Sequence, residues 1–424
     1  MKKFITLLLV LTGMVSTASA DYYVFYNQDS SYDGHLLATL TDDDGDGVYS
    51  AIVNLETAGK LGWGSIEIMV STSSTFNWTN GTLLWANLDS NKGILDENSF
   101  TLSETWSKDG KIAIPVKDAT PDTYAIELEY NESTKTFSGT RLIEFASSND
   151  DWHTSNPVYM PETAHNTGIF VKILKLPKDT EFKFVSNNNG GVGWYGNKDN
   201  SSIATDGSNI TISDNGAYTI TANFNSTYVA PVRVTATTSV GAKGYSTYCN
   251  SDYALDFSDK SIKAYTISST NGSSLTLTQK NKIAKNEPVL LYSSTNSDSQ
   301  TIPTILDSDA TADATNKLVK GSGTALTWAV GSEYYVLATA TVDPGFYRAN
   351  NNTVAANKAY LDLRGLSGAH SFSLDLGEEN TTGIATINGE KEIMNNAFYN
   401  LNGQEVAQPT KGLYIMNGKK VIIK

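Results

Sequence analysis

Tryptophans in polar, glycine-rich segments are the residues whose type and setting best suit ligand contact. Trp152 follows the run NDD, and Trp194 and Tyr195 follow SNNNGGVG. Aromatic residues outside an alternating strand pattern have no obvious core to fill. Because sugars pack their C–H faces on aromatic rings while their hydroxyls need polar partners, these residues form a candidate sugar site. The polar residues expected beside it are Lys183, Asn197 and Lys198.

A second candidate sugar platform lies earlier in the chain. Trp63 in LGWGS and Trp78 in FNWTNG also stand in turn-like segments. Trp85 follows two leucines, and we expect it in the hydrophobic core. For each loop tryptophan, the alternative role is a lid over such a core.

The stretch LTDDDGDGVYSAIVNL raises the question of a calcium site. Asp42, Asp44, Asp46 and Gly47 match the first half of an EF-hand-type loop. Val53 stands where that loop needs its last carboxylate, and a strand pattern follows instead of a helix. We therefore expect a turn, with a weak calcium site as the alternative.

Residues for catalysis are sparse. The four histidines show no metal-ligand spacing, and no G-x-S-x-G motif occurs. The 45 acidic residues leave a glycosidase carboxylate pair open as an alternative. Small β modules offer little room for a deep cleft, so we expect no enzymatic activity and no cofactor.

Short strands are the elements that must position these residues. Alternating segments such as TYAIELEY, AYTITANF and SLTLTQ recur between turns rich in Gly, Asn, Ser and Asp. This pattern predicts an all-β chain of tandem Ig-like β-sandwich modules. At the end of the chain, GLYIM and KKVIIK flank Asn417-Gly418, which predicts a C-terminal β-hairpin.

An internal repeat indicates the domain organisation. Aligning Gly47 with Gly168 places GVYSAIVNL over GIFVKILKL. Further on, TYAIELEYN matches AYTITANFN, which pairs Tyr124 with Tyr218 and Asn131 with Asn225. The second copy has ETAHNTG in place of the aspartates, which favours the turn interpretation. The predicted divisions are two repeat modules at 21–140 and 141–233, a third β domain at 234–378, a linker at 379–395 and a terminal segment at 396–424.

The remaining features concern export and partners. Residues 1–20 have the basic start, apolar centre and small-residue end of a signal peptide. No later apolar run is long enough for a membrane helix, so we expect no transmembrane span. The net charge of −14 and the lack of a basic stripe argue against nucleic acid as a partner. The single Cys249 has no cysteine to pair with inside the chain.

The terminal segment NAFYNLNGQEVAQPTKGLYIMNGKKVIIK resembles the type IX secretion C-terminal sorting domain of Bacteroidetes proteins. This resemblance implies export by the type IX secretion machinery and attachment at the outer-membrane surface or release to the exterior. The alternative is a final hairpin that packs on the third domain. That third domain is similar to a β domain of unassigned role that often precedes such tails.

The second repeat, with NDDWHTSNPVYM, NTGIFVKILKLPKDTEFKFVSNNNGGVGWYG and ITISDNGAYTITANFN, resembles the Ig-like carbohydrate-binding modules of SusE/SusF starch-binding proteins. The resemblance implies a non-catalytic, cell-surface polysaccharide-binding protein for a starch-like α-glucan. A cysteine for lipid attachment is missing at the signal junction, which departs from that family. The alternatives are a structural or adhesive protein that binds another protein, and a glycan-cleaving enzyme.

Overall fold

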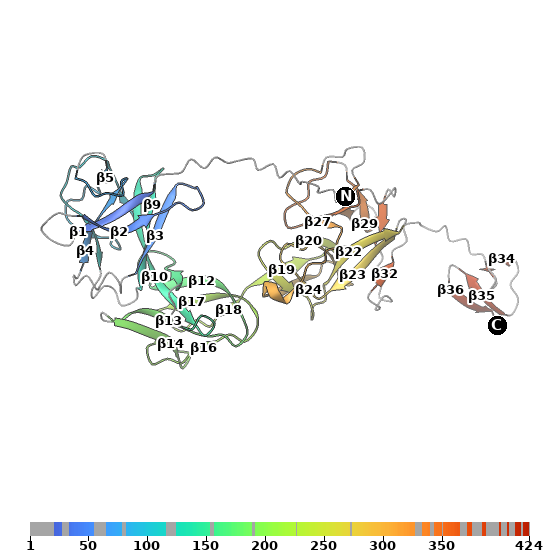
Figure 1. Ribbon diagram of the computed structural model, residues 1–424. Helices are drawn as coiled ribbons and strands as arrows, with labels where there is room; N and C mark the ends of the chain where they lie inside the picture. The colour runs from blue at the N-terminus through green and yellow to red at the C-terminus, as the bar shows by residue number, and fades with distance from the viewer. Residues whose placement is uncertain are drawn as a thin grey trace, which may run out of the picture. The chain divides into compact units, whose positions relative to one another are not determined.

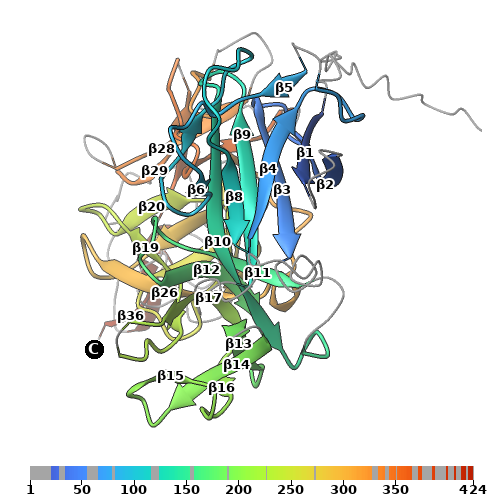
Figure 2. The same cartoon turned by 90° about the vertical axis from the view of Figure 1, so that its left-hand side faces the viewer.

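A computed structural model describes most of the chain, and it is shown in Figure 1 and, turned by 90°, in Figure 2. The described residues are 21–27, 34–54, 65–78, 82–115, 124–152, 157–188, 191–225, 227–271, 274–326, 333–339, 343–349, 351–364, 371–374, 384–386, 398–399, 405–406, 412–416 and 419–423. The predicted signal peptide at 1–20 and Trp63 lie outside them. The chain divides into two compact units, Met1–Val234 and Thr235–Lys424.

The first sandwich of unit 1 packs two sheets around one apolar core. One sheet has the order β2-β1-β4-β8-β6, with β5 beside β4, and the facing sheet contains β3, β9, β7 and the start of β10. Val24, Ile68 and Ile114 point inward from the first sheet and meet Tyr49 and Leu128 of the second. The strands are β1 (Tyr22–Asn27), β2 (Gly34–Leu40), β3 (Val48–Asn54), β4 (Ser65–Ser71), β5 (Leu83–Leu84), β6 (Lys92–Gly93), β7 (Phe100–Thr101), β8 (Ile112–Pro115), β9 (Ala125–Asn131) and β10 (Thr136–Ser147).

The second sandwich of unit 1 uses the other end of β10. There β10 pairs with β11 and β13, and β14 and β15 continue this sheet. Phe145 and Phe184 from this sheet pack against Phe170 and Ile220 from the facing sheet, β12-β17-β18. The strands are β11 (Val158–Pro161), β12 (Ile169–Leu176), β13 (Glu181–Asn188), β14 (Gly191–Lys198), β15 (Ser202–Ala204), β16 (Ile210–Thr211), β17 (Gly216–Asn223) and β18 (Val232–Arg233).

Strand β10 is shared by both sandwiches, as Figure 2 shows. Thr136–Leu142 pair with β9 of the first sandwich, whereas Glu144–Ser147 pair with β13 of the second. At the changeover, the buried Arg141 donates from Nε to Glu162 Oε2 at 2.9 Å, and a second bond joins the same side chains. The module boundary expected at residue 140 therefore falls inside one continuous strand.

The strand pair at the heart of the repeat recurs with a small offset. β3 pairs with β9 so that Val48 lies opposite Asn131, and β12 pairs with β17 so that Ile169 lies opposite Asn223. The sequence alignment pairs Asn131 with Asn225 instead. A two-residue offset leaves each side chain on the same face of its strand, so the alternating pattern alone does not detect it.

Unit 2 contains three stacked sheets. The middle sheet, β20-β25-β22-β23-β32, packs one face on β19-β26-β21-β24 and the other on β27-β30-β28-β29-β31. Val289 and Leu291 enter one core and Leu290 between them enters the other, as strand alternation requires.

The elements of these three sheets are β19 (Thr235–Ser239), β20 (Tyr245–Tyr248), β21 (Ala254–Asp256), β22 (Lys263–Asn271), β23 (Ser274–Lys280), β24 (Lys282–Ile283), β25 (Val289–Tyr292), β26 (Ser299–Ile305), the 3-10 turn η1 (Asp307–Asp309), β27 (Leu318–Lys320), β28 (Tyr334–Ala338), β29 (Gly345–Arg348), β30 (Ala359–Asp362), β31 (Ser371–Ser373) and β32 (Ile384–Thr386).

The end of the chain has a short sheet of its own, ordered β34-β33-β35-β36. Its strands are β33 (Phe398–Tyr399), β34 (Glu405–Val406), β35 (Gly412–Met416) and β36 (Lys419–Ile423). β35 and β36 pair antiparallel, as predicted for the C-terminal hairpin; the Asn417-Gly418 pair between them lies outside the described residues. The predicted linker contains β32, which pairs with β23. Across the described parts, the prediction of an all-β fold built from sandwich modules is confirmed.

Candidate functional site

Trp152 and Trp194 lie together in unit 1, with ring centroids 6.4 Å apart and planes at 61°. Trp194 stands on strand β14, because the segment expected to be a loop continues a hairpin with β13. Both rings are half-buried, and both pack against a small cluster of buried side chains that includes Tyr124 and Val185. The pair therefore meets edge to face and rests on the outer face of the sheet.

The other predicted residues of this site are divided between the two faces. Tyr195 points to the sandwich core, where its ring lies 5.1 Å from that of Phe224. Asn197 has the same strand parity as Tyr195 and donates to Asn200 at 2.8 Å. Lys198 pairs with Asp206. Lys183, which neighbours Val185 on β13, and Lys198, at the end of β14, have the strand parity of the Trp194 face.

The aspartate-rich stretch forms a compact turn between β2 and β3. One carboxylate of Asp42 accepts the backbone N–H groups of Gly45 at 2.7 Å, Asp46 at 3.2 Å and Gly47 at 3.0 Å. Desolvation opposes ionisation of Asp42, but these hydrogen bonds outweigh it and lower the pKa of the carboxyl. Carboxylate oxygens of Asp42, Asp44 and Asp46 lie within 4.8 Å of one another. The contacts of Asp42 are those of a turn-forming residue.

An open pocket lies in the first sandwich, on the outer face of the sheet that contains β1, β4 and β8. Its volume is about 590 Å³. It is lined by Asn27, Glu67, Trp78, Trp85, Trp106, Asp109 and Lys111, and we call it the aromatic pocket. Trp106 is 53% exposed and Trp78 is 41% exposed, so two large rings face solvent at its rim.

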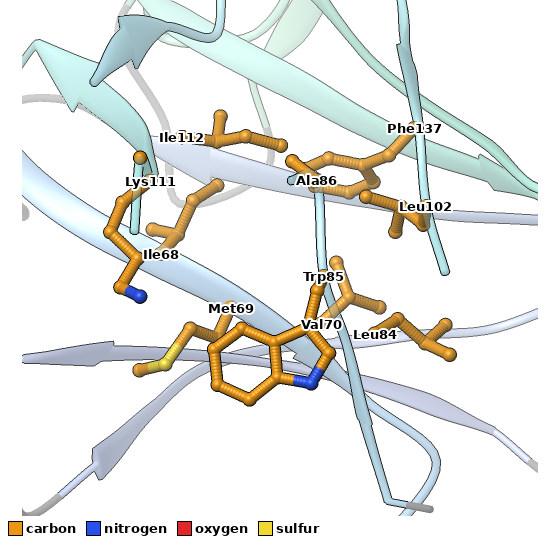
Figure 3. A pocket seen from close by; sticks show the side chains of 11 residues that line it. Ile68, Met69, Val70, Leu84, Trp85, Ala86, Leu102, Lys111, Ile112 and Phe137 are labelled. Carbon is orange, nitrogen blue, oxygen red and sulfur yellow. The ribbon is translucent and has the colours of Figure 1, made fainter. Parts of the chain in front are cut away.

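Strand alternation explains why these side chains gather outside the core. Leu84 points into the core, and Trp85, the next residue, turns its ring to the outer face. Figure 3 shows a separate, smaller pocket that Trp85 and Lys111 also line, with the Trp85 ring beside Met69. Lys111 Nζ lies 5.0 Å from the centre of the Trp85 ring, a cation–π distance.

The three tryptophans are held by different contacts. Trp78 and Trp85 have centroids 6.2 Å apart and planes at 27°, so they are nearly parallel. Trp78 also meets Phe76 edge to face at 5.0 Å. A side chain at Gly34 would collide with the Phe76 ring, because an added Cβ would lie 2.2 Å from it. Glycine at this position on β2 thus leaves room for the aromatic group behind Trp78.

Trp106 is positioned by its loop, which runs from Ser103 to Gly110. Asn87 donates to the Thr105 carbonyl at 2.9 Å and accepts from the Ser107 N–H at 2.7 Å. Its side chain therefore binds the loop backbone on both sides of Trp106. Asn87 has a φ of 51°, a conformation that asparagine tolerates better than most residues. At the loop end, the Gly110 N–H donates to the Leu88 carbonyl at 2.9 Å.

The polar groups of the aromatic pocket combine acceptors and donors. Asn27 lies directly opposite Glu67 in the β1–β4 pairing, and Asn27 Oδ1 is a buried acceptor without a hydrogen-bond partner in the described structure. Asn91 donates to Glu67 at 2.8 Å and accepts from the Lys111 backbone N–H at 2.8 Å. Two carboxylates, one ammonium and the Asn27 side chain therefore line the pocket.

Sequence reasoning found part of this site. Trp78 was expected at a sugar platform and lies in the aromatic pocket, whereas the expected partner Trp63 is outside the described residues. The expectation that Trp85 fills the core is wrong, because its ring lines the pocket. Trp106 went unrecognised, although its setting in SETWSKDG is the same signal that drew attention to Trp152.

Comparison with known proteins gives few matches. No family model matches the chain, and no curated protein matches it. Among solved structures, the chain is similar to SusF from Bacteroides thetaiotaomicron, with 11% identity, a TM-score of 0.22, and coverage of 67% of this chain and 72% of that one. A likeness of this size carries no functional argument. Within the described residues, no helix has the length and apolar character needed to cross a membrane.

Proposed function

We propose that this protein binds polysaccharide without cleaving it, and that the aromatic pocket of the first sandwich is its principal binding site. The observation that supports this proposal is the grouping of Trp78, Trp85 and Trp106 around polar side chains on the outer face of a rigid sheet. Aromatic rings offer flat surfaces to the C–H faces of sugars. The open rim leaves space for a chain that continues beyond the pocket.

The electrostatics of the pocket favour a neutral, hydroxyl-rich ligand. Glu67 and Asp109 can accept hydrogen bonds, and Lys111 can donate them. Charges of both signs at one site suit hydroxyls, which donate and accept, better than a highly charged ligand.

The polysaccharide we propose is a starch-like α-glucan, and the proposed setting is the cell surface after export through the type IX machinery. This assignment rests on the sequence resemblances of the second repeat and the C-terminal segment. The Trp152–Trp194 pair remains a second candidate contact for the same chain. The two sites belong to neighbouring sandwiches joined by β10.

Native gel electrophoresis of the full chain in gels that contain starch, dextran or xylan tests the proposal. Retardation in the starch gel is expected for the wild type and for the control Ile173→Ala, which truncates a half-exposed residue of the second sandwich. The variant Trp106→Ala should lose retardation. Equal migration in all gels contradicts polysaccharide binding and favours a structural or adhesive role, whereas release of reducing sugar contradicts the non-catalytic assignment.

A further inference from the structure

Unit 2 contains a cavity of about 490 Å³ that the proposed function does not use. It is bordered by β20, β28 and the segment that leads into β30. Lys358 is the single charged residue among the described residues that line it. The other polar lining includes Ser246, Thr247, Thr339 and Thr353.

The Lys358 ammonium has a hydroxyl partner and no carboxylate partner in the described structure. Its Nζ donates to Ser246 Oγ at 2.8 Å, and it does not occur in the ion pairs of the described residues. The side chain of Lys358 is partly buried, and this desolvation lowers the pKa of its amine. A partly desolvated charge without a counterion attracts an anion more strongly than a fully hydrated one does.

The backbone around Lys358 is fixed by neighbouring contacts. Ala359 N–H donates to Thr247 Oγ1 at 3.0 Å, and Lys358 N–H donates to the Ala355 carbonyl at 2.9 Å. Thr247 and Ala359 are both buried. The ammonium is therefore presented from a rigid segment beside hydroxyl groups that can bind further oxygens of a ligand.

We propose that this cavity binds a hydroxylated carboxylate, the chemistry of a sugar acid, with the carboxylate on Lys358 and Ser246 and the ligand hydroxyls on the threonines. The net charge of the protein is −14, so a general attraction for anions is not expected. Recognition of a carboxylate at this point therefore depends on Lys358 itself.

Ligand-observed saturation-transfer NMR on the full chain tests this proposal with D-glucuronate as the probe. D-glucose is the matched neutral sugar and acetate is the bare carboxylate. We expect glucuronate to bind at least about tenfold more tightly than either, a difference of about 1.4 kcal/mol. Lys358→Met should remove this preference, while Lys282→Met, which removes one exposed positive charge from β24, should retain it.

The sugar site of unit 1 must be separated from this signal. The preference for glucuronate should persist in Trp106→Ala, which is designed to disable only the aromatic pocket. If Lys358→Met does not fold, Ser246→Ala takes its place and should weaken glucuronate binding by about threefold or more. Equal binding of glucuronate and glucose, equal binding of glucuronate and acetate, or an unchanged preference in the folded variants overturns the proposal.

Discussion

Trp78 and Trp85 present nearly parallel rings to the aromatic pocket, with an interplanar angle of 27°. Trp152 and Trp194 instead meet edge to face at 61° on a cluster of buried side chains. Parallel rings at an open rim offer a surface for a sugar chain. In an edge-to-face pair, the edge of one ring covers part of the face of the other, which leaves less aromatic surface for a ligand. This contrast is the reason why we propose the first pair, and not the second, for the principal site.

The variant Trp194→Ala should lower the stability of unit 1 more than it lowers glucan binding. Because the ring is half-buried, we expect a loss of about 1–3 kcal/mol, below the ~3–5 kcal/mol of a fully buried tryptophan. Denaturant unfolding and a binding titration on the same sample measure the two effects. A variant with wild-type stability and abolished binding would instead make the Trp152–Trp194 pair the principal site.

Asn87→Ala should weaken ligand binding, although Asn87 does not line the aromatic pocket. Two hydrogen bonds to the Trp106 loop are lost, each with a net contribution of about 0.5–1.5 kcal/mol, and the positive φ becomes less favourable. We expect the affinity for glucan to fall about three- to tenfold. Asn209→Ala, which removes a hydrogen bond to Glu181 in the second sandwich, is the control and should bind normally. Unchanged affinity in Asn87→Ala would show that the loop needs no such support.

The Asp42→Ala variant should melt a few degrees below the wild type, while the Asp44→Asn variant should melt at nearly the wild-type temperature. The lowered pKa of Asp42 means that its contribution to stability is present above about pH 4 and is lost as the pH falls through the folded-state pKa. The difference between wild type and Asp42→Ala should therefore shrink in acid. Calcium should leave the melting temperatures of the wild type and of Asp42→Ala unchanged. A calcium-dependent rise confined to the wild type would refute the turn interpretation.

Glu162→Ala should strongly destabilise the junction of the two sandwiches. Glu162 binds Arg141 through two hydrogen bonds and accepts the Gly168 N–H at 2.6 Å, and all of these groups are buried. Removing one member of a buried ion pair typically costs about 3–5 kcal/mol, because the other charge is left unpaired. Glu181→Ala on the exposed part of β13 is the matched control. Equal unfolding curves for the two variants would mean that water replaces the carboxylate without loss.

The sequence predicted the all-β fold because alternation is a local property of each strand. Alternation did not predict the different positions of Leu84 and Trp85, because both are large and apolar. The pleat of the strand directs Leu84 inward and Trp85 outward. The aromatic pocket also depends on pairings between distant strands, such as Asn27 opposite Glu67, which single-strand patterns do not specify. The offset between the β3–β9 and β12–β17 pairs has the same origin.

The most direct test of the account is isothermal titration of a linear α-glucan oligosaccharide into the wild type and Trp106→Ala. Trp106 is 53% exposed, so its removal should change stability by less than about 0.5 kcal/mol. Loss of its ring should weaken binding at least about tenfold, equivalent to about 1.4 kcal/mol. Equal affinity of the two proteins, with wild-type melting of the variant, would contradict the central claim that the aromatic pocket binds the glucan.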